Sequence, residues 1–238
     1  MDWLQRFLTS TIGLKVIMAV SGLVLVGFVI GHMLGNLQIF LEFVEEGMGR
    51  EALNQYGALL KGNKLLLWGT RVTLLVAVAA HIYSACVLTL RARAARPANY
   101  KQHKWLSGSY AVRTMRWGGV ILLAFIVYHL LHLTVGSEVT PSIEHCKVVG
   151  DGLQCPIFDN VVQGFRQPGV VLFYVIAQLA LGFHLAHGIW SLFRTLGLGN
   201  PRFDGIIKKI AVGTAAAVTL GNVAIPVSVL VGLVGGAV

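Results

Sequence analysis

The chain has 238 residues, of which 55% are hydrophobic and only 12% are charged, and its formal net charge at pH 7 is +9. This composition excludes an ordinary soluble domain and is typical of an integral membrane protein. The basic excess does not indicate a nucleic-acid partner, because the Lys and Arg residues lie between long apolar runs.

Five runs without Asp, Glu, Lys or Arg are each long enough to cross a hydrocarbon core of about 30 Å as a helix. They cover residues 16–41, 72–90, 117–137, 167–193 and 210–238. Every backbone amide in lipid needs an internal partner, so the runs predict one all-α domain over 1–238, an integral membrane bundle of five transmembrane helices. The expected helices span approximately 12–41, 64–91, 113–136, 168–195 and 205–236.

The charges between the runs predict the orientation of the bundle. Thirteen of the 19 Lys and Arg residues precede the first run or follow the second and fourth runs. Eight of the ten Asp and Glu residues follow the first and third runs. By the positive-inside rule, the N-terminus is expected in the cytoplasm and, after five crossings, the C-terminus outside.

The first run is too long for the apolar core of a secretory signal, which has about 7–15 residues, so we expect it to be retained as the first helix. It contains His32 and three glycines four residues apart, Gly27, Gly31 and Gly35. Such a stripe allows close approach of another helix or of a flat ligand. The acidic loop that follows contains an amphipathic stretch, 51–60, which we expect to lie along the membrane surface.

The second helix carries His81 among small residues, and Arg71 near its outer end is expected to reach the interface. The segment 91–112 that follows is basic and contains interleaved aromatic residues. It suits either a soluble partner or anionic lipid.

The third helix carries His129 and His132, and the loop after it is the longest outer segment. This loop contains Cys146 and Cys155 on the oxidising side of the membrane. A disulfide between them is the expected state, and two free thiols are the alternative.

The fourth helix carries His184 and, three residues later, His187. The fifth helix has no histidine and contains Pro226, where we expect a kink. We therefore expect the fifth helix to serve in packing.

Four of these histidines lie at matched depths, nine or ten residues before the charge that ends each run. The four are His32 before Glu42, His81 before Arg91, His129 before Glu138, and His184 before Arg194. Consecutive helices run in opposite directions, so His32 and His129 should share the outer half of the bilayer. His81 and His184 should share the inner half. Ionisable residues at such depth are functional by default, and opposed imidazoles are what six-coordinate haem b requires. Two haems b are expected, in layers roughly 10 Å apart.

His132 and His187 are each three residues from a predicted ligand, so either member of each pair could face the interior. Both lie closer to the water, which favours His129 and His184 as the ligands. A hydrogen bond to a haem propionate or to a quinone carbonyl is one role for His132 and His187. The other is that of an ordinary interfacial histidine.

Four segments together resemble the di-haem cytochrome b anchors of succinate dehydrogenases and fumarate reductases, in the five-helix form made of a single chain, which are the membrane part of respiratory complex II. They are IGLKVIMAVSGLVLVGFVIGHMLGN at 12–36, AHIYSACVL at 80–88, SYAVRTMRWGGVILLAFIVYHLLHLTVG at 109–136, and LGFHLAHGIWSLFRTLG at 181–197. Nothing in the sequence resembles a flavin fold or an iron–sulfur cysteine array. This agrees with a subunit that does not itself oxidise succinate.

The resemblance implies that His32 and His129 hold the outer haem and that His81 and His184 hold the inner one. It implies a flavoprotein subunit and an iron–sulfur subunit as partners, in a complex that could assemble into a higher oligomer. It also implies a bacterial cytoplasmic membrane, and a quinone, expected to be menaquinone, as the substrate that receives electrons in this branch of the tricarboxylic acid cycle.

In the family, quinone chemistry lies near the outer haem, which directs attention to the polar residues of that region. These are Asn36, Gln38, Glu42, Arg71 and His132. The chain departs from some fumarate reductases of the family at Gly182, where those relatives have a glutamate linked to proton transfer. Their proton route is therefore not expected here.

Three alternatives stay open. A fumarate reductase anchor would use the same parts in the reverse direction. A cytochrome b of a formate dehydrogenase or hydrogenase would serve a different soluble enzyme. An ion or proton transporter would carry intramembrane histidines without haem.

Overall fold

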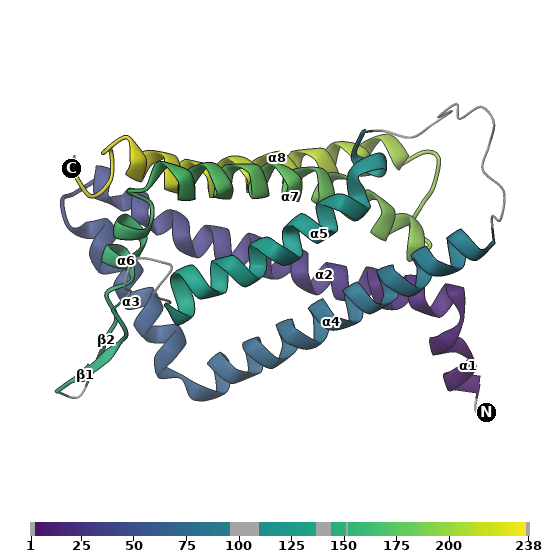
Figure 1. The fold of residues 1–238 in the computed structure, drawn as a ribbon, viewed down its shortest axis with the longest axis horizontal. Helices are drawn as coiled ribbons and strands as arrows, with labels where there is room; N and C mark the ends of the chain where they lie inside the picture. Colours follow the sequence, from purple (N-terminus) through teal and green to yellow (C-terminus); the bar gives the residue numbers. More distant parts are fainter. Residues whose placement is uncertain (1–2, 96–109, 137–143, 151, 237–238) are drawn as a thin grey trace.

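The computed structural model describes residues 3–95, 110–136, 144–150 and 152–236, and most of them lie in helices (Figure 1). Within these residues, five helices are long and apolar enough to cross a membrane. They are α2 (Thr11–Asn36), α4 (Lys64–Ala94), α5 (Tyr110–Leu130), α7 (Pro168–Thr195) and α8 (Asp204–Leu230). The expectation of an all-α, multi-pass membrane bundle is confirmed. Glu138, which marked the end of the third run, lies outside the described residues.

Polar side chains begin two of the spans. Ser10 Oγ accepts a hydrogen bond of 2.9 Å from the backbone N–H of Gly13 and so caps α2. Asn63 Oδ1 accepts one of 3.0 Å from the backbone N–H of Leu66 and caps α4. These caps satisfy amides that the first turn of a helix leaves without partners. The first cap agrees with the expected start of the first helix near residue 12.

Three helix ends differ from simple α-helical spans. The first span tightens after Asn36 into a 3₁₀ segment, η1 (Leu37–Phe43), and α5 continues as a π-helical segment, η2 (Leu131–Val135). The fifth helix ends at Leu230 rather than near residue 236. It stops there because a glycine-rich tail follows, in which Gly232 and Gly235 have φ angles of 75° and 81°. This left-handed region favours glycine and ends helices.

The spans pack around α7 and α2. Helix α7 packs against α8, α5 and α2, whereas α4 packs against α2 (Figure 1). A buried apolar cluster joins α2, α7 and α8 and consists of Met33, Leu185, Ile189, Ala211, Ala215 and Val218. The histidine-free α8 therefore serves in packing, as its composition indicated.

Short elements cover one end of the bundle, which we call the capped end. They are η1, α3 (Met48–Gly62), α6 (Ile157–Gly164) and the antiparallel hairpin β1 (Lys147–Val149) and β2 (Gly152–Gln154). A buried cluster under them includes Ile39, Leu53, Phe158, Val162 and Phe165. Arg50 of α3 forms an ion pair with Asp159 of α6 and lies over the Phe158 ring. The opposite end carries α1 (Trp3–Thr9), and we call it the α1 end (Figure 1).

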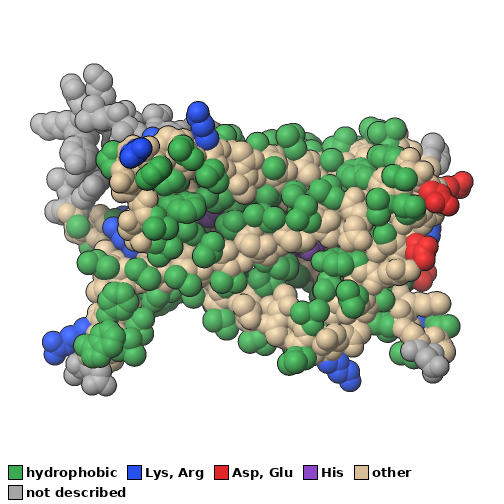
Figure 2. All heavy atoms as spheres, turned by 180° about the vertical axis from the view of Figure 1, so that it is seen from behind, with side chains coloured by type: hydrophobic (Ala, Val, Ile, Leu, Met, Phe, Trp, Pro, Cys, Tyr) green, Lys and Arg blue, Asp and Glu red, His purple; other side chains and the backbone are tan. Residues whose placement is uncertain are grey.

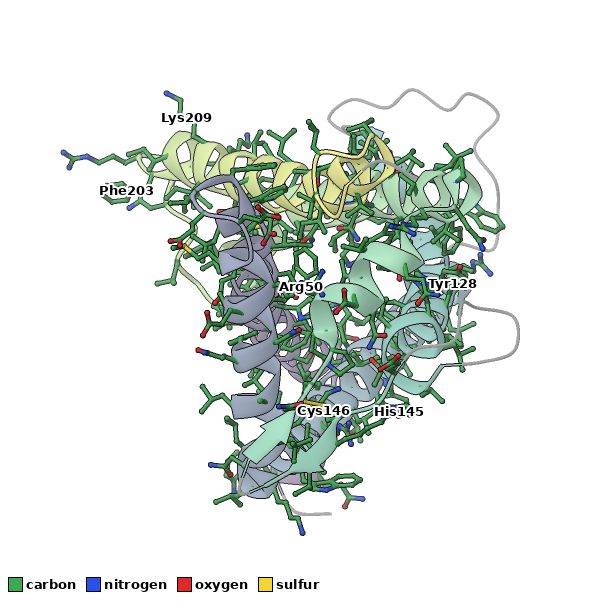
Figure 3. All side chains as sticks on the ribbon, turned by 90° about the vertical axis from the view of Figure 1, so that its left-hand side faces the viewer. Arg50, Tyr128, His145, Cys146, Phe203 and Lys209 are labelled. Carbon is green, nitrogen blue, oxygen red and sulfur yellow. A yellow bond between two sulfur atoms is a disulfide. The ribbon has the colours of Figure 1, made fainter. Side chains whose placement is uncertain are left out.

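A disulfide between Cys146 and Cys155 closes the hairpin (Figure 3). The two cysteines flank the paired residues Lys147 and Gln154 at the open end of the hairpin. Asn160 of α6 holds the same segment, because its side chain bonds both the N–H and the carbonyl of Glu144. The hairpin is thus tied to the cap at its base.

Large hydrophobic side chains cover the flanks of the bundle. On the face in Figure 2, they extend along the length of the molecule, and the acidic side chains visible there gather at the capped end. Exposed apolar residues come from several spans, for example Leu75, Val120, Leu172, Leu179 and Leu220. Such a surface suits contact with lipid rather than water.

Candidate functional site

Four histidines from four different spans face one another in two pairs. The rings of His32 in α2 and His129 in α5 have centroids 5.8 Å apart and planes at 87°. The rings of His81 in α4 and His184 in α7 have centroids 6.2 Å apart and planes at 55°. These are the partners that the matched depths indicated.

The two pairs lie at different levels of the bundle. His129 of α5 contacts Tyr174 of α7. His184 lies ten residues after Tyr174 on α7, which corresponds to about 15 Å at a rise of 1.5 Å per residue. This rise along α7 is of the same order as the layer separation of roughly 10 Å expected from the sequence.

The backbone of α2 orients His81. His81 Nδ1 donates to the carbonyl of Met18 at 3.1 Å and lies 3.3 Å from Ser21 Oγ. A carbonyl can only accept, so Nδ1 carries the ring proton and Nε2 of the neutral ring keeps a free lone pair. This arrangement is the one that metal-binding histidines use, since a hydrogen bond on one nitrogen fixes the other for ligation.

Aromatic rings and an amide surround the other pair. Phe28 stacks on His32 with centroids 5.4 Å apart, and Phe125 lies 5.6 Å from the His129 ring. The side-chain amide of Asn36 donates to His32 Nε2 at 3.1 Å, so this nitrogen is unprotonated. The His32 Nε2 lone pair is thus engaged by Asn36 in this structure, and this bond would have to open before Nε2 could bind a metal.

The helices that carry each pair stand apart. Among the described residues, neither α2 with α5 nor α4 with α7 packs over an extended surface, although their imidazoles face each other. Side chains added at Gly27 and Gly31 of α2 would meet nothing within 4 Å. Figure 2 shows histidine side chains at the bottom of hollows between the helices. Of the glycine stripe, only Gly35 makes a close approach, to the ring of Tyr56.

Each pair fits the axial coordination of one haem iron. Two imidazoles on opposite sides of a metal, with bonds of about 2.0 Å, have ring centroids about 6 Å apart. The observed 5.8 and 6.2 Å agree with this spacing. Each pair supplies two donors, the number that a metal already held by four porphyrin nitrogens needs.

Buried polar atoms without partners also gather at the pairs. Within the described residues these are Ser84 Oγ, His132 Nε2 and His184 Nδ1. Ser84 follows His81 by three residues, and His132 follows His129 by three. An unsatisfied buried polar group costs about 1–3 kcal/mol, so Ser84 Oγ and His184 Nδ1 fit a site that a further group completes, whereas His132 Nε2 faces Gly164 of α6.

The two remaining span histidines differ in their surroundings. His132 is fully buried, and its Nδ1 lies 2.8 Å from the hydroxyl of Tyr174. His187 is half-buried and packs near Trp190, with ring centroids 5.9 Å apart. Neither ring makes a close contact with a partner imidazole on the opposite span in the described structure.

The residues that the resemblance assigned to quinone do not form one group among the described residues. Asn36 contacts His32, but the Gln38 amide bonds the Gly35 carbonyl. Glu42 accepts hydrogen bonds from two backbone amides at the start of α3. The Arg71 guanidinium lies over Trp68 at 5.2 Å on the exposed side of α4. Only Asn36 and His132 lie beside a paired histidine.

Sequence reasoning missed several residues that position the pairs. His81 is held by hydrogen bonds with the Met18 carbonyl and the Ser21 hydroxyl. The Tyr174 hydroxyl holds both His129 and His132. A signal was present for Ser21 and Tyr174, because polar groups inside apolar spans need partners. A backbone carbonyl such as that of Met18 leaves no such signal.

Gly182 lies against α8. A side chain there would collide with Thr219 Oγ1, whose hydroxyl bonds the Ala215 carbonyl at 2.8 Å. The space that a longer residue would need is therefore filled. Nearby, Asn222 donates to Gln178 Oε1 at 3.0 Å, which joins α7 to α8 by a polar contact.

Two cavities lie towards the α1 end. One of about 220 Å³ lies between α5 and α7 and includes His184, Gly118 and Ala180 in its wall. The other, of about 490 Å³, lies between the start of α2 and the end of α7, where Lys15 and Arg194 line it. Lys15 and Arg194 give this second cavity positive charge at the α1 end.

Comparison with protein-family models, with curated proteins and with solved structures gives no match to this chain.

Proposed function

We propose that this chain is the membrane-anchor cytochrome b subunit of a succinate:quinone oxidoreductase in a bacterial cytoplasmic membrane. The observation that carries the proposal is the two facing histidine pairs, with centroids 5.8 and 6.2 Å apart on helices that stand apart. His32 and His129 would hold an outer haem b, and His81 and His184 an inner one. When bound, these haems supply one-electron transfer.

The residues of the chain prepare each pair for this role. The Met18 carbonyl keeps the proton of His81 on Nδ1 and directs Nε2 away from α2. The rings of Phe28 and Phe125 pack on His32 and His129 and give them apolar neighbours. An unpaired charge costs free energy in such apolar surroundings, so the histidines are more stable as neutral imidazoles than as imidazolium ions.

The charge distribution supports an orientation with the N-terminus in the cytoplasm and the C-terminus outside. In that orientation, the α1 end faces a flavoprotein subunit and an iron–sulfur subunit, and the capped end faces outward. The His81–His184 pair then lies nearer the electron donor. Lys15 and Arg194 line the cavity at this end, where cations suit the carboxylates that haem b carries.

Menaquinone is the proposed electron acceptor, near the outer pair. Asn36 and His132 are the polar residues of the predicted quinone set that lie beside a paired histidine. Gln38, Glu42 and Arg71 have other local partners, which makes them secondary candidates. The same arrangement would serve fumarate reduction with the direction of flow reversed.

The test is to purify the tagged chain with its native partners from membranes. The proposal predicts a flavin-containing and an iron–sulfur subunit, together with succinate oxidation coupled to reduction of a menaquinone analogue. His81→Ala should abolish the quinone-linked rate and leave the dye-linked rate of the soluble subunits. Co-purification with a molybdenum or nickel enzyme, or the absence of haem, would contradict the proposal.

A further inference from the structure

One buried hydroxyl is shared by two histidines at the outer pair. Tyr174 of α7 is 5% exposed, and its hydroxyl lies 3.2 Å from His129 Nδ1 and 2.8 Å from His132 Nδ1. Its ring packs edge-on against Phe125 and Phe165, with centroids 5.1 and 4.8 Å away. The hydroxyl is therefore fixed between two imidazoles that stand three residues apart.

The number of protons limits the arrangement. A tyrosine hydroxyl donates one hydrogen bond, so it cannot donate to both nitrogens. At most one imidazole can accept the Tyr174 proton, so at least one imidazole donates to the Tyr174 oxygen. Where His129 donates, its Nδ1 carries the ring proton and its Nε2 is free. Where His129 accepts, its ring proton lies on Nε2.

We propose that Tyr174 is a positioning residue that makes His129, rather than His132, the outer haem ligand. By accepting from His129 Nδ1, it leaves His129 Nε2 with a free lone pair for the metal. By donating to His132 Nδ1, it occupies that nitrogen and places the His132 proton on Nε2. The inference rests on the proposed function and goes beyond it, because it assigns the choice between the two histidines to a residue of α7.

The surroundings of His132 support this assignment. A Cβ atom added at Gly164 of α6 would lie 2.9 Å from His132 Nε2, so this nitrogen points at the cap rather than at His32. The His132 ring also packs against Tyr128 and Phe165, with centroids 5.5 and 5.8 Å away. The fully buried ring is held by the cap as well as by Tyr174, so a turn toward the pair needs both the loss of the Tyr174 bond and a shift of the cap.

Removal of the hydroxyl gives a measurable consequence. A hydrogen bond from Nδ1 raises the basicity of a ligating imidazole, and loss of such a partner weakens metal binding by about 10–100-fold. A more basic ligand favours ferric iron, so Tyr174→Phe should raise the midpoint potential of the outer haem. A tenfold weaker preference for ferric over ferrous iron corresponds to about 59 mV. Loss of the Tyr174 bond also removes one of the two restraints on His132, and the fraction of molecules in which the cap shifts as well should give a second outer-haem species.

The experiment compares the purified complex carrying the wild-type chain, Tyr174→Phe or Tyr128→Phe. Tyr128 is a matched control because its ring packs on the same His132, whereas its hydroxyl has no hydrogen bond among the described residues. Optical redox titration and EPR of the ferric haems report each haem separately. A third variant combines Tyr174→Phe with His132→Ala, and removal of the competitor should restore a single outer species.

Three results support the proposal: a raised outer potential, a mixture of outer species, or loss of the outer haem alone, each in Tyr174→Phe and absent in Tyr128→Phe. Tyr174→Phe that titrates as wild type, an equal change in Tyr128→Phe, or loss of both haems in Tyr174→Phe alone would overturn it. A wild-type complex without haem would instead refute the proposed function, before any variant is compared.

Discussion

Replacement of His81 by alanine should remove one of two haems and leave the other. His81 is held by Met18 and Ser21 and faces His184, and none of these residues contacts the outer pair. The two levels are about 15 Å apart along α7. Changes more than about 7–10 Å apart with no shared partner act independently. The haem content of the complex should therefore fall from two to one per chain.

The assay is a pyridine haemochrome measurement on the purified complex, with the dithionite-reduced spectrum recorded in parallel. The matched control is His132→Ala, which removes an equally large imidazole from the same bundle but should retain both haems. Quinone-linked succinate oxidation should be lost in His81→Ala, and dye-linked oxidation should persist. Unchanged haem content in His81→Ala would refute the pairing, and loss of a haem in His132→Ala would show that His132 is a ligand.

The remaining predictions concern the capped end. Gly49→Ala places a Cβ atom within 2.5–2.7 Å of backbone atoms of η1, so it should destabilise the fold by about 1–3 kcal/mol. Gly62→Ala is the control, because a Cβ atom there meets nothing within 4 Å. Thermal unfolding of both variants checks this prediction. Cys146→Ser should cost about 2–3 kcal/mol by releasing the loop closed with Cys155, and a reductant should lower the melting temperature of the wild type but not of the variant. Glu42→Ala should cost about 1 kcal/mol through loss of the α3 cap, with the KM for quinone unchanged; a large rise in that KM would show that Glu42 binds quinone instead.

The spans could be predicted because lipid leaves the backbone few choices. Runs without charge must be helical in a membrane, so five runs predicted five helices. Helix ends were less predictable, since η1, η2 and the end of α8 depend on local backbone geometry. The glycines at 232 and 235 end α8 in left-handed conformations, although the apolar pattern continues past them.

The histidine partners could also be anticipated, because depth in a membrane is counted along the sequence. Their ligation stays a prediction. The quinone set shows the limit of this reasoning. Glu42 follows the first span, where a polar residue suits an interfacial site, yet it bonds the amides of Gly47 and Arg50. Such contacts come from the fold of the cap, which no periodicity in the sequence describes.

The charge that ends a run was also an imprecise marker of a helix end. Charges mark where a run ends in the sequence, but Arg91 lies inside α4, where it donates to the Thr9 carbonyl at 2.8 Å. The helix continues past Arg91 to Ala94. A charge is therefore a poor marker of the membrane boundary when its side chain has a partner.

The central claim is that the two histidine pairs bind haem b, and the haem-to-protein ratio of the purified complex tests it most directly. A dithionite-reduced minus oxidised spectrum with b-type α and Soret bands, and a ratio of two haems per chain, is the predicted result. A complex that is folded, contains this chain in full and shows no Soret band would contradict the claim.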